Sequence, residues 1–344
     1  MIRHILMTAD AGGNDWTYSL ELARALAGHG ARVSLSTSGG SISKEQRREA
    51  ARVPGLAVYD VGFNLDWSEG FPKDLRKAAD WMLTLEERLK PDIVHMNGFR
   101  YGPIAFRSPL VVAAHSDSEI LPGPAESSDR VRFRSEMCAV LDLANLLVAP
   151  TYALLERLKA VYQVQTPTRV IPYFRRNSDY RNSPKQKFVF SAGRNTNSAS
   201  EHSIIETAAG ELDWPVITAS GAAITLKSAE QMSKAAIYCL TSQSEASDVP
   251  VLEGALCRCA LVIGDVPNLR ENWNNCALFV PPGDSELLKK NLQTLIVDQD
   301  LREELAQRAY ARAREFSPER CIDDYLDAYQ SAWSNKYKSS RNPR

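Results

Sequence analysis

Several features that would assign the chain to a common class are missing from its sequence. No apolar run is long enough to span a bilayer. The apolar run in the opening stretch MIRHILMTADAGG is also too short for a signal peptide. The net charge of -1 gives no bulk attraction to nucleic acid. We therefore expect a cytoplasmic protein without nucleic-acid partners. A peripheral membrane contact stays open, although no amphipathic basic helix supports it.

Two further absences concern metals and cofactors. None of the six cysteines forms a C-x-x-C pair, and Cys257 and Cys259 fall at a predicted helix end, where two thiols do not easily share one metal. We predict buried, reduced thiols, no metal site and no cofactor. No G-x-G-x-x-G follows the first predicted strand, which argues against a Rossmann dehydrogenase.

The first half of the chain alternates predicted strands and helices. The 344 residues suit two domains with a cleft between them. Residues 2–8 form an apolar strand that breaks at Gly12 and Gly13, and an amphipathic helix then leads to a second strand at 31–37. This order predicts a parallel sheet. The glycines allow a backbone to approach a ligand or simply make a tight turn, and spacing alone does not decide between these.

Two histidines follow later strands of this half. His95 lies in the strand PDIVHMN, and His115 comes directly after the buried strand at 110–114. Parallel sheets bind ligands at the carboxyl ends of their strands, so both histidines are candidate site residues. A lone histidine at a strand end is more often structural than catalytic, so position alone leaves both roles open.

Residues 241–284 carry the most informative pattern. Glu245 and Glu253 flank a loop-to-helix junction at which Asp248 is a natural N-cap, and a proline two positions later suits the first turn. We therefore start this helix at Val249. Its amide ends favour an anion, and flanking carboxylates accept hydrogen bonds from hydroxyls, which together suit a sugar nucleotide. E-x7-E alone is weak, since a solvated pair of glutamates has the same spacing.

Longer motifs carry a family resemblance. The run from E-x7-E through ALCRCALVIGDVPNLRE to FVPPGD resembles the donor-site signature of retaining GT-B glycosyltransferases of family 4. The segments LELARALAGHGARVSLST, PDIVH, PLVVAAHSD and the Gly-Arg pair at 193–194 resemble other motifs of the same family, so the resemblance covers most of the chain. It implies an α/β protein of the GT-B fold, with two Rossmann-like, doubly wound parallel-sheet domains facing a central cleft.

The resemblance, with the composition of the connecting segments, predicts the domain limits. The expected parts are an acceptor-side domain at 1–174, a polar linker at 175–187, a nucleotide-sugar-binding domain at 188–316, a helix at 317–334 that crosses back to the first domain, and a disordered basic tail at 335–344.

The family also implies an activity and a set of site residues. It implies transfer of a sugar, with retention and without a metal, from a UDP-, GDP- or ADP-sugar to an acceptor (glycan, lipid or small molecule) that the sequence does not identify. The implied catalytic residues are His115, Glu245 and Arg194, and the implied substrate-binding residues are Gly12, Gly13, Glu253, Asp248, Val249 and His95.

Two positions depart from the family pattern. Ala199 stands where a lysine is usual, which removes a cation from the diphosphate site. Asp248 stands where a glycine is usual, and an anion at a phosphate-binding mouth is unfavourable unless its side chain turns back to cap the helix. Two alternatives therefore remain: a non-catalytic or weakened GT-B homologue acting as a binding or partner subunit, and a sugar-nucleotide epimerase, which would need its own acid and base carboxylates.

Overall fold

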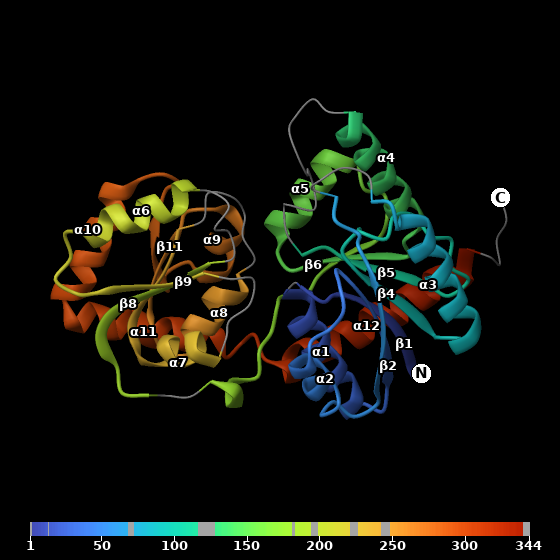
Figure 1. Ribbon diagram of the computed structural model, residues 1–344, viewed down its shortest axis with the longest axis horizontal. Coiled ribbons are helices and arrows are strands. Elements are labelled where there is room, and N and C mark those ends of the chain that lie inside the picture. The colour runs from blue at the N-terminus through green and yellow to red at the C-terminus, as the bar shows by residue number, and fades with distance from the viewer. Residues whose placement is uncertain are drawn as a thin grey trace. The chain divides into compact units, whose positions relative to one another are not determined.

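The computed structural model describes residues 2–12, 14–67, 72–115, 128–180, 183–193, 199–220, 226–241 and 248–339. The chain forms two compact units, one comprising Met1–Pro172 with Pro318–Arg344 and the other comprising Tyr173–Ser317. Each unit has one parallel sheet between layers of helices (Figure 1). The prediction of two doubly wound α/β domains is confirmed.

The first unit is built on a seven-stranded sheet with the order β3-β2-β1-β4-β5-β6-β7. The chain leaves β1 toward one edge and returns on the other side at β4, so the strand order reverses between β1 and β4. Doubly wound sheets bind ligands at the carboxyl ends of the strands beside such a reversal. The strands are β1 (His4–Asp10), β2 (Arg32–Ser38), β3 (Leu56–Phe63), β4 (Ile93–Asn97), β5 (Leu110–Ala113), β6 (Leu146–Ala149) and β7 (Thr168–Val170).

Six helices lie within the described residues of this unit. They are α1 (Asn14–Gly28), α2 (Lys44–Ala50), α3 (Leu75–Leu89), α4 (Ser128–Leu143), α5 (Tyr152–Tyr162) and α12 (Pro318–Ser339). Helix α12 packs against α1, β5 and β6, although it comes from the far end of the sequence (Figure 1). The expected end of this helix at residue 334 is too early. Asn335 and Lys336 still donate hydrogen bonds, to the carbonyls of Asn145 and Phe106, and these contacts hold the additional turn.

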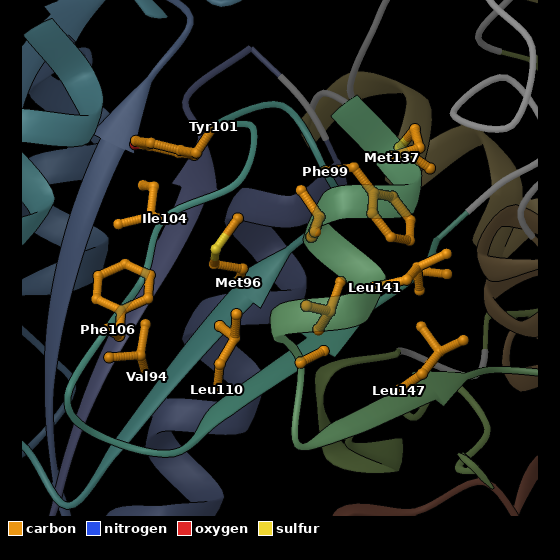
Figure 2. Close-up of a cluster of buried hydrophobic side chains, with 14 of the residues drawn as sticks. Val94, Met96, Phe99, Tyr101, Ile104, Phe106, Leu110, Met137, Leu141 and Leu147 are labelled. Atoms are coloured by element: carbon orange, nitrogen blue, oxygen red, sulfur yellow. The ribbon is translucent and has the colours of Figure 1, made fainter. Parts of the chain in front are cut away.

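Side chains of β4 alternate between the two faces of the sheet, as the geometry of a strand requires. Val94 and Met96 enter an apolar cluster that α4 covers with Leu141 (Figure 2). His95 and Asn97 therefore lie on the opposite face, toward α1 and α12. Strand periodicity thus puts the polar pair on one face of the sheet, and the packing of the C-terminal helix covers that face.

The second unit has a five-stranded sheet with the order β12-β11-β10-β8-β9. Its strand order reverses between β8 and β10, and the chain passes from the end of β10 to helix α8. Its strands are β8 (Gln186–Gly193), β9 (Val216–Ser220), β10 (Ala235–Leu240), β11 (Ala260–Gly264) and β12 (Ala277–Val280). Its helices are a 3-10 turn at Asn177–Asp179, α6 (Ala199–Ala209), α7 (Leu226–Lys234), α8 (Val249–Leu256), α9 (Pro267–Trp273), α10 (Ser285–Val297) and α11 (Gln299–Ala313).

None of the helices in the described part of the chain combines the length and apolar character needed to cross a bilayer.

Candidate functional site

A buried polar cluster lies at the carboxyl ends of β4 and β5 in the first unit. The Nε2 atoms of His115 and His95 lie 2.9 Å and 3.0 Å from one atom, Oδ1 of Asn97. All three side chains are buried. The two histidines singled out in the sequence are therefore brought together, through an asparagine that sequence reasoning missed. The H-x-N spacing on one strand was the available signal, because residues two apart share a face.

Burial keeps both imidazoles uncharged near neutral pH. It lowers the pKa of His95 to about 3, with the neighbouring His115 as a second cause. Burial also lowers the pKa of His115, an effect that Arg100 strengthens and Asp15 opposes. Neutral imidazoles exchange hydrogen bonds with hydroxyl groups without bringing a charge to the site.

Three tyrosines, two of them from α12, surround this pair. The hydroxyl of Tyr329 lies 2.8 Å from Nδ1 of His95. The hydroxyls of Tyr18 and Tyr325 are hydrogen-bonded to each other, and the ring of Tyr18 meets that of His115 edge-on, with centroids 4.8 Å apart. The C-terminal helix therefore contributes directly to the surroundings of the candidate site.

The predicted glycine loop after β1 is tied down by Asp10. Its Oδ1 accepts a hydrogen bond from the amide of Gly12 at 3.0 Å, and its Oδ2 pairs with Arg100. Gly39 has a φ of +79°, and a Cβ there would lie 2.0 Å from Asp10 Oδ1, so this close approach requires glycine. Gly13 lies outside the described residues, and its role stays a prediction.

In the second unit Glu253 is held by two residues from the segment expected to be a linker. Nε of Arg175 donates to Glu253 Oε1 at 3.1 Å, and the hydroxyl of Tyr180 donates to the same oxygen at 2.9 Å. Arg175 is 4% exposed and Glu253 9% exposed, so this ion pair is buried. Polarity and missing periodicity suggested a linker, whereas residues 175–180 form part of the packed unit.

Helix α8 begins at Val249, as predicted, with Asp248 at its N-cap. Among the described contacts, however, the Asp248 side chain makes no capping bond and instead accepts a hydrogen bond from Nδ2 of Asn272, on α9, at 2.5 Å. Burial raises the pKa of Asp248 to about 6, and the Asn272 bond opposes this rise. The sequence analysis expected the Asp248 carboxylate to cap its own helix. In the structure it is instead buried beside the amide of Asn272.

Close packing sets the height of α8 above the sheet. A Cβ on Gly254 would lie 2.9 Å from the ring of Tyr238, a fully buried side chain of β10. Because the contact is with the base of the ring, the side chain has little freedom to move away. Glycine in mid-helix thus lets α8 approach β10 closely.

We expect Gly254→Ala to destabilise the protein by about 1–3 kcal/mol, because overpacking outweighs the better helix propensity of alanine. The matched control is Gly28→Ala at the end of α1, where an added Cβ meets nothing within 4 Å. Urea denaturation of both variants measures the difference. Equal midpoints for the two variants would contradict the packing argument.

Two predicted catalytic residues, Arg194 and Glu245, lie outside the described residues. Their roles stay predictions. Ala199, at the position of the usual lysine, is the first residue of α6. Each unit thus places its described candidate residues near the reversal of its strand order, the first with neutral hydrogen-bonding groups and the second with a helix N-terminus and a paired carboxylate.

Two family models match the chain. The model of Glycosyltransferase Family 4 matches residues 16–174, and that of Glycosyl transferases group 1 matches residues 226–312. The chain is a GT-B glycosyltransferase of the family 4 type. The two matches fall on opposite halves of the sequence, one in each of the two units.

Solved structures show that this glycosyltransferase has relatives of the same fold. Sucrose-phosphate synthase from Thermosynechococcus elongatus is 15% identical to this chain with a TM-score of 0.75, and the match covers 96% of this chain and 99% of the synthase chain. A glycosyltransferase from Rickettsia africae is 13% identical with a TM-score of 0.72, covering 97% and 99%. HepE of Anabaena, solved with UDP-glucose, is 16% identical with a TM-score of 0.70, covering 95% and 99%. No match is found among curated protein sequences.

Proposed function

We propose that this glycosyltransferase transfers a sugar, with retention of configuration, from a nucleotide-diphosphate sugar bound mainly by the second unit. The acceptor belongs to the first unit in this proposal. Retention and the donor class rest on the resemblance of residues 241–284 to the family signature. The six free cysteines are consistent with work in a reducing compartment such as the cytoplasm.

The arrangement of Glu253 carries the proposal. Both of its hydrogen bonds within the described chain, from Arg175 and Tyr180, converge on Oε1. The second carboxylate oxygen, Oε2, is therefore left to accept from a ligand. Its two lone pairs can accept two hydroxyl hydrogens, which suits the vicinal diol of a ribose. The buried ion pair fixes the side chain in place, which lowers the entropy lost on binding.

The remaining roles follow the electrostatics of the reaction. Breaking the bond between sugar and diphosphate develops negative charge on the leaving group, which cationic and amide donors stabilise. We assign this task to Arg194 and to the amides at the start of α8, and we assign contacts with the transferring sugar to Glu245. His115, with His95 behind it, contacts the sugar or the acceptor through hydrogen bonds.

Isothermal titration calorimetry with UDP, GDP and ADP tests the donor site. UDP is the first candidate, because HepE of Anabaena was solved with UDP and with UDP-glucose. We expect one nucleotide to bind, and Arg194→Ala and Glu253→Gln each to weaken it by roughly tenfold to a hundredfold, the worth of a charge-assisted hydrogen bond. Glutamine keeps the shape of Glu253 and still accepts from Arg175.

Glu286→Ala, at an exposed glutamate of α10 in the same unit, is the control and should bind like the wild type. Binding that neither Arg194→Ala nor Glu253→Gln weakens would contradict the assigned site. Absence of binding to all three nucleotides would instead favour a weakened or non-catalytic homologue, for which Ala199 provides the reason. Ala199→Lys should then restore measurable affinity if the lost cation is the cause.

A further inference from the structure

We propose that the second unit binds a phosphate group at a site around the hydroxyl of Tyr310 on α11. The donors of this phosphate site are the guanidinium groups of Arg258 and Arg314, the side-chain amide of Asn177 and the Tyr310 hydroxyl itself. The ligand is inorganic phosphate or the phosphate of a monoester. Arg258 follows the C-terminal end of α8, and the proposed donor site lies at the other end of this helix, about 12 Å away.

Arg258 occupies a backbone position at which glycine is the usual residue. Its amide donates to the carbonyl of Ala255 at 2.9 Å. The next amide, that of Cys259, donates to the carbonyl of Gly254 at 3.0 Å. This pair of bonds ends a helix with one residue in the left-handed conformation, and the φ of Arg258 is +60°. An arginine here accepts a steric cost that glycine avoids, so the role of its side chain needs an explanation.

The Arg258 side chain lies over the ring of Tyr310, with Cζ 3.9 Å from the ring centroid. A guanidinium group stacked on an aromatic ring keeps its N–H donors in its own plane, where they can still bind an oxyanion. Cζ of Arg314, four residues beyond Tyr310, lies 6.0 Å from the same centroid. Both arginines are exposed. Two cations with donors accessible to a ligand therefore share one ring.

Neither of these guanidinium groups forms an ion pair with a carboxylate in the described residues of the unit. Other arginines of α11 do, since Arg308 pairs with Glu304 and Arg312 with Glu315. Two like charges beside one ring repel each other, and an anion that both reach relieves this repulsion. The planar donor fork of arginine matches the oxygens of a phosphate group.

The hydroxyl of Tyr310 adds a donor at the same place. Its oxygen accepts a hydrogen bond from Nδ2 of Asn177 at 3.3 Å, so its own hydrogen is directed elsewhere. Within the described chain this hydrogen has no acceptor. The bond from Asn177 and the charges of Arg258 and Arg314 lower the pKa of Tyr310, although partial burial opposes the shift. The surroundings of this oxygen thus favour negative charge.

The donors approach from three separate elements, which decides the class of anion. They come from the end of α8, from α11 and from the 3-10 turn at Asn177–Asp179. A tetrahedral phosphate has oxygens that point in several directions and accepts from all of these donors. A planar carboxylate accepts from fewer of them, and chloride is a single point. We therefore expect selectivity for phosphate over acetate and chloride.

Nitrogen-15 spectra of the arginine Nε–H groups in the full chain test the site, because they report on each guanidinium group separately. Inorganic phosphate is titrated at constant ionic strength, with sodium acetate in chloride buffer as the reference. We expect saturable shifts of the Arg258 and Arg314 signals with phosphate and none with acetate. Absence of a saturable shift, or equal shifts with the two anions, overturns the proposal.

Three variants show which groups bind. Arg258→Asn removes the cation and keeps the left-handed turn, which asparagine tolerates, and should weaken phosphate binding by roughly tenfold or more. Tyr310→Phe keeps the ring beneath the guanidinium group and should weaken binding by roughly fivefold. Arg308→Gln removes a cation from α11 outside the site and should bind phosphate like the wild type. The same dissociation constant in all three variants contradicts the assignment.

Further arms of the titration identify the occupant and separate the two proposed sites. Tighter binding of glycerol 2-phosphate than of inorganic phosphate would identify a phosphate monoester as the ligand, and weaker binding would identify phosphate itself. Arg194→Ala should leave the phosphate shift of Arg258 unchanged. Phosphate binding that this variant abolishes, without shifts at Arg258 and Arg314, overturns the proposal.

The design does not depend on any single variant or on the proposed function. Should Arg258→Asn not fold, the wild-type titration and Tyr310→Phe still decide. Failure of nucleotide binding would alter none of these signals, so the two proposals fail separately.

Discussion

Replacing Arg175 by methionine is expected to lower the free energy of unfolding by about 3–5 kcal/mol, the range measured when one partner of a buried ion pair is removed. The side chain of Arg175 is 4% exposed and that of Glu253 12% exposed. Methionine fills the space but leaves the carboxylate of Glu253 buried without its cation, beside the phenol of Tyr180. Chemical denaturation at neutral pH, followed by tryptophan fluorescence, measures the loss.

A second variant shows whether the uncompensated charge is the cause. In the double variant Arg175→Met, Glu253→Leu both charges are gone, and we expect most of the lost stability to return. Arg308→Met is the matched control, because its partner Glu304 forms an exposed pair within α11 that is worth about 0.3–0.5 kcal/mol. If Arg175→Met unfolds at the same denaturant concentration as Arg308→Met, the Arg175–Glu253 pair has no special role in stability.

Asp248→Asn is expected to stabilise the protein at pH 8 by roughly 3 kcal/mol, with no comparable gain at pH 4. The pKa of Asp248 is raised by burial from 3.8 to about 6 in the folded state. The folded protein therefore holds this proton more tightly than the unfolded chain. The Asp248 carboxyl group therefore contributes to the free energy of unfolding, and this contribution is fully present below the pKa that the group has in the unfolded chain. It is lost as the pH rises through the pKa that the group has in the folded protein. Asparagine keeps the bond from Asn272 and does not ionise, so this loss disappears.

Unfolding free energies of both proteins between pH 4 and pH 8 provide the measurement. Asp265→Asn is an informative comparison, because Arg270 lowers the pKa of Asp265 and the pH dependence has the opposite sign. The contribution of Asp265 to the free energy of unfolding is present above its pKa in the unfolded chain and is lost as the pH falls through its pKa in the folded protein. A parallel pH dependence in the wild type and Asp248→Asn would show that the carboxyl group titrates normally.

The Asp248 variant also bears on the proposed function. An anion at the start of α8 opposes the binding of a diphosphate, so removing it should tighten the nucleotide found by calorimetry, most of all at high pH. The departure of this position from the family pattern thus becomes a measurable property of the proposed donor site.

Local patterns in the sequence predicted what depends on near neighbours. The start of α8 at Val249 was predicted from an aspartate followed by a proline, because caps act within one turn of a helix. The strands ending near His95 and His115 were predicted from apolar runs, and the parallel order followed from their alternation with helices. The family motifs added the assignment as a glycosyltransferase, which the two family models bear out, whereas retention and the donor class stay predictions.

Contacts between distant parts of the chain could not be predicted in this way. Arg175 meets Glu253 across 78 positions, and Tyr329 meets His95 across 234. Each pair depends on which strands are neighbours and on which face a helix covers, and these are decided when separate elements pack. Arg175 was assigned to a linker, because a polar segment without periodicity gives no sign of a buried partner.

The sequence by itself thus determined the alternation of strands and helices that makes a parallel sheet, the strand ends that carry the two histidines and the helix that begins at Val249, since each follows from periodicity or capping over a few residues. The GT-B fold class was implied by the family motifs. Only the tertiary structure decided that Asn97 joins the histidines, that Arg175 holds Glu253 and that Asp248 turns to Asn272. The physical reason is that a buried polar group takes whichever partner packing brings within about 3 Å.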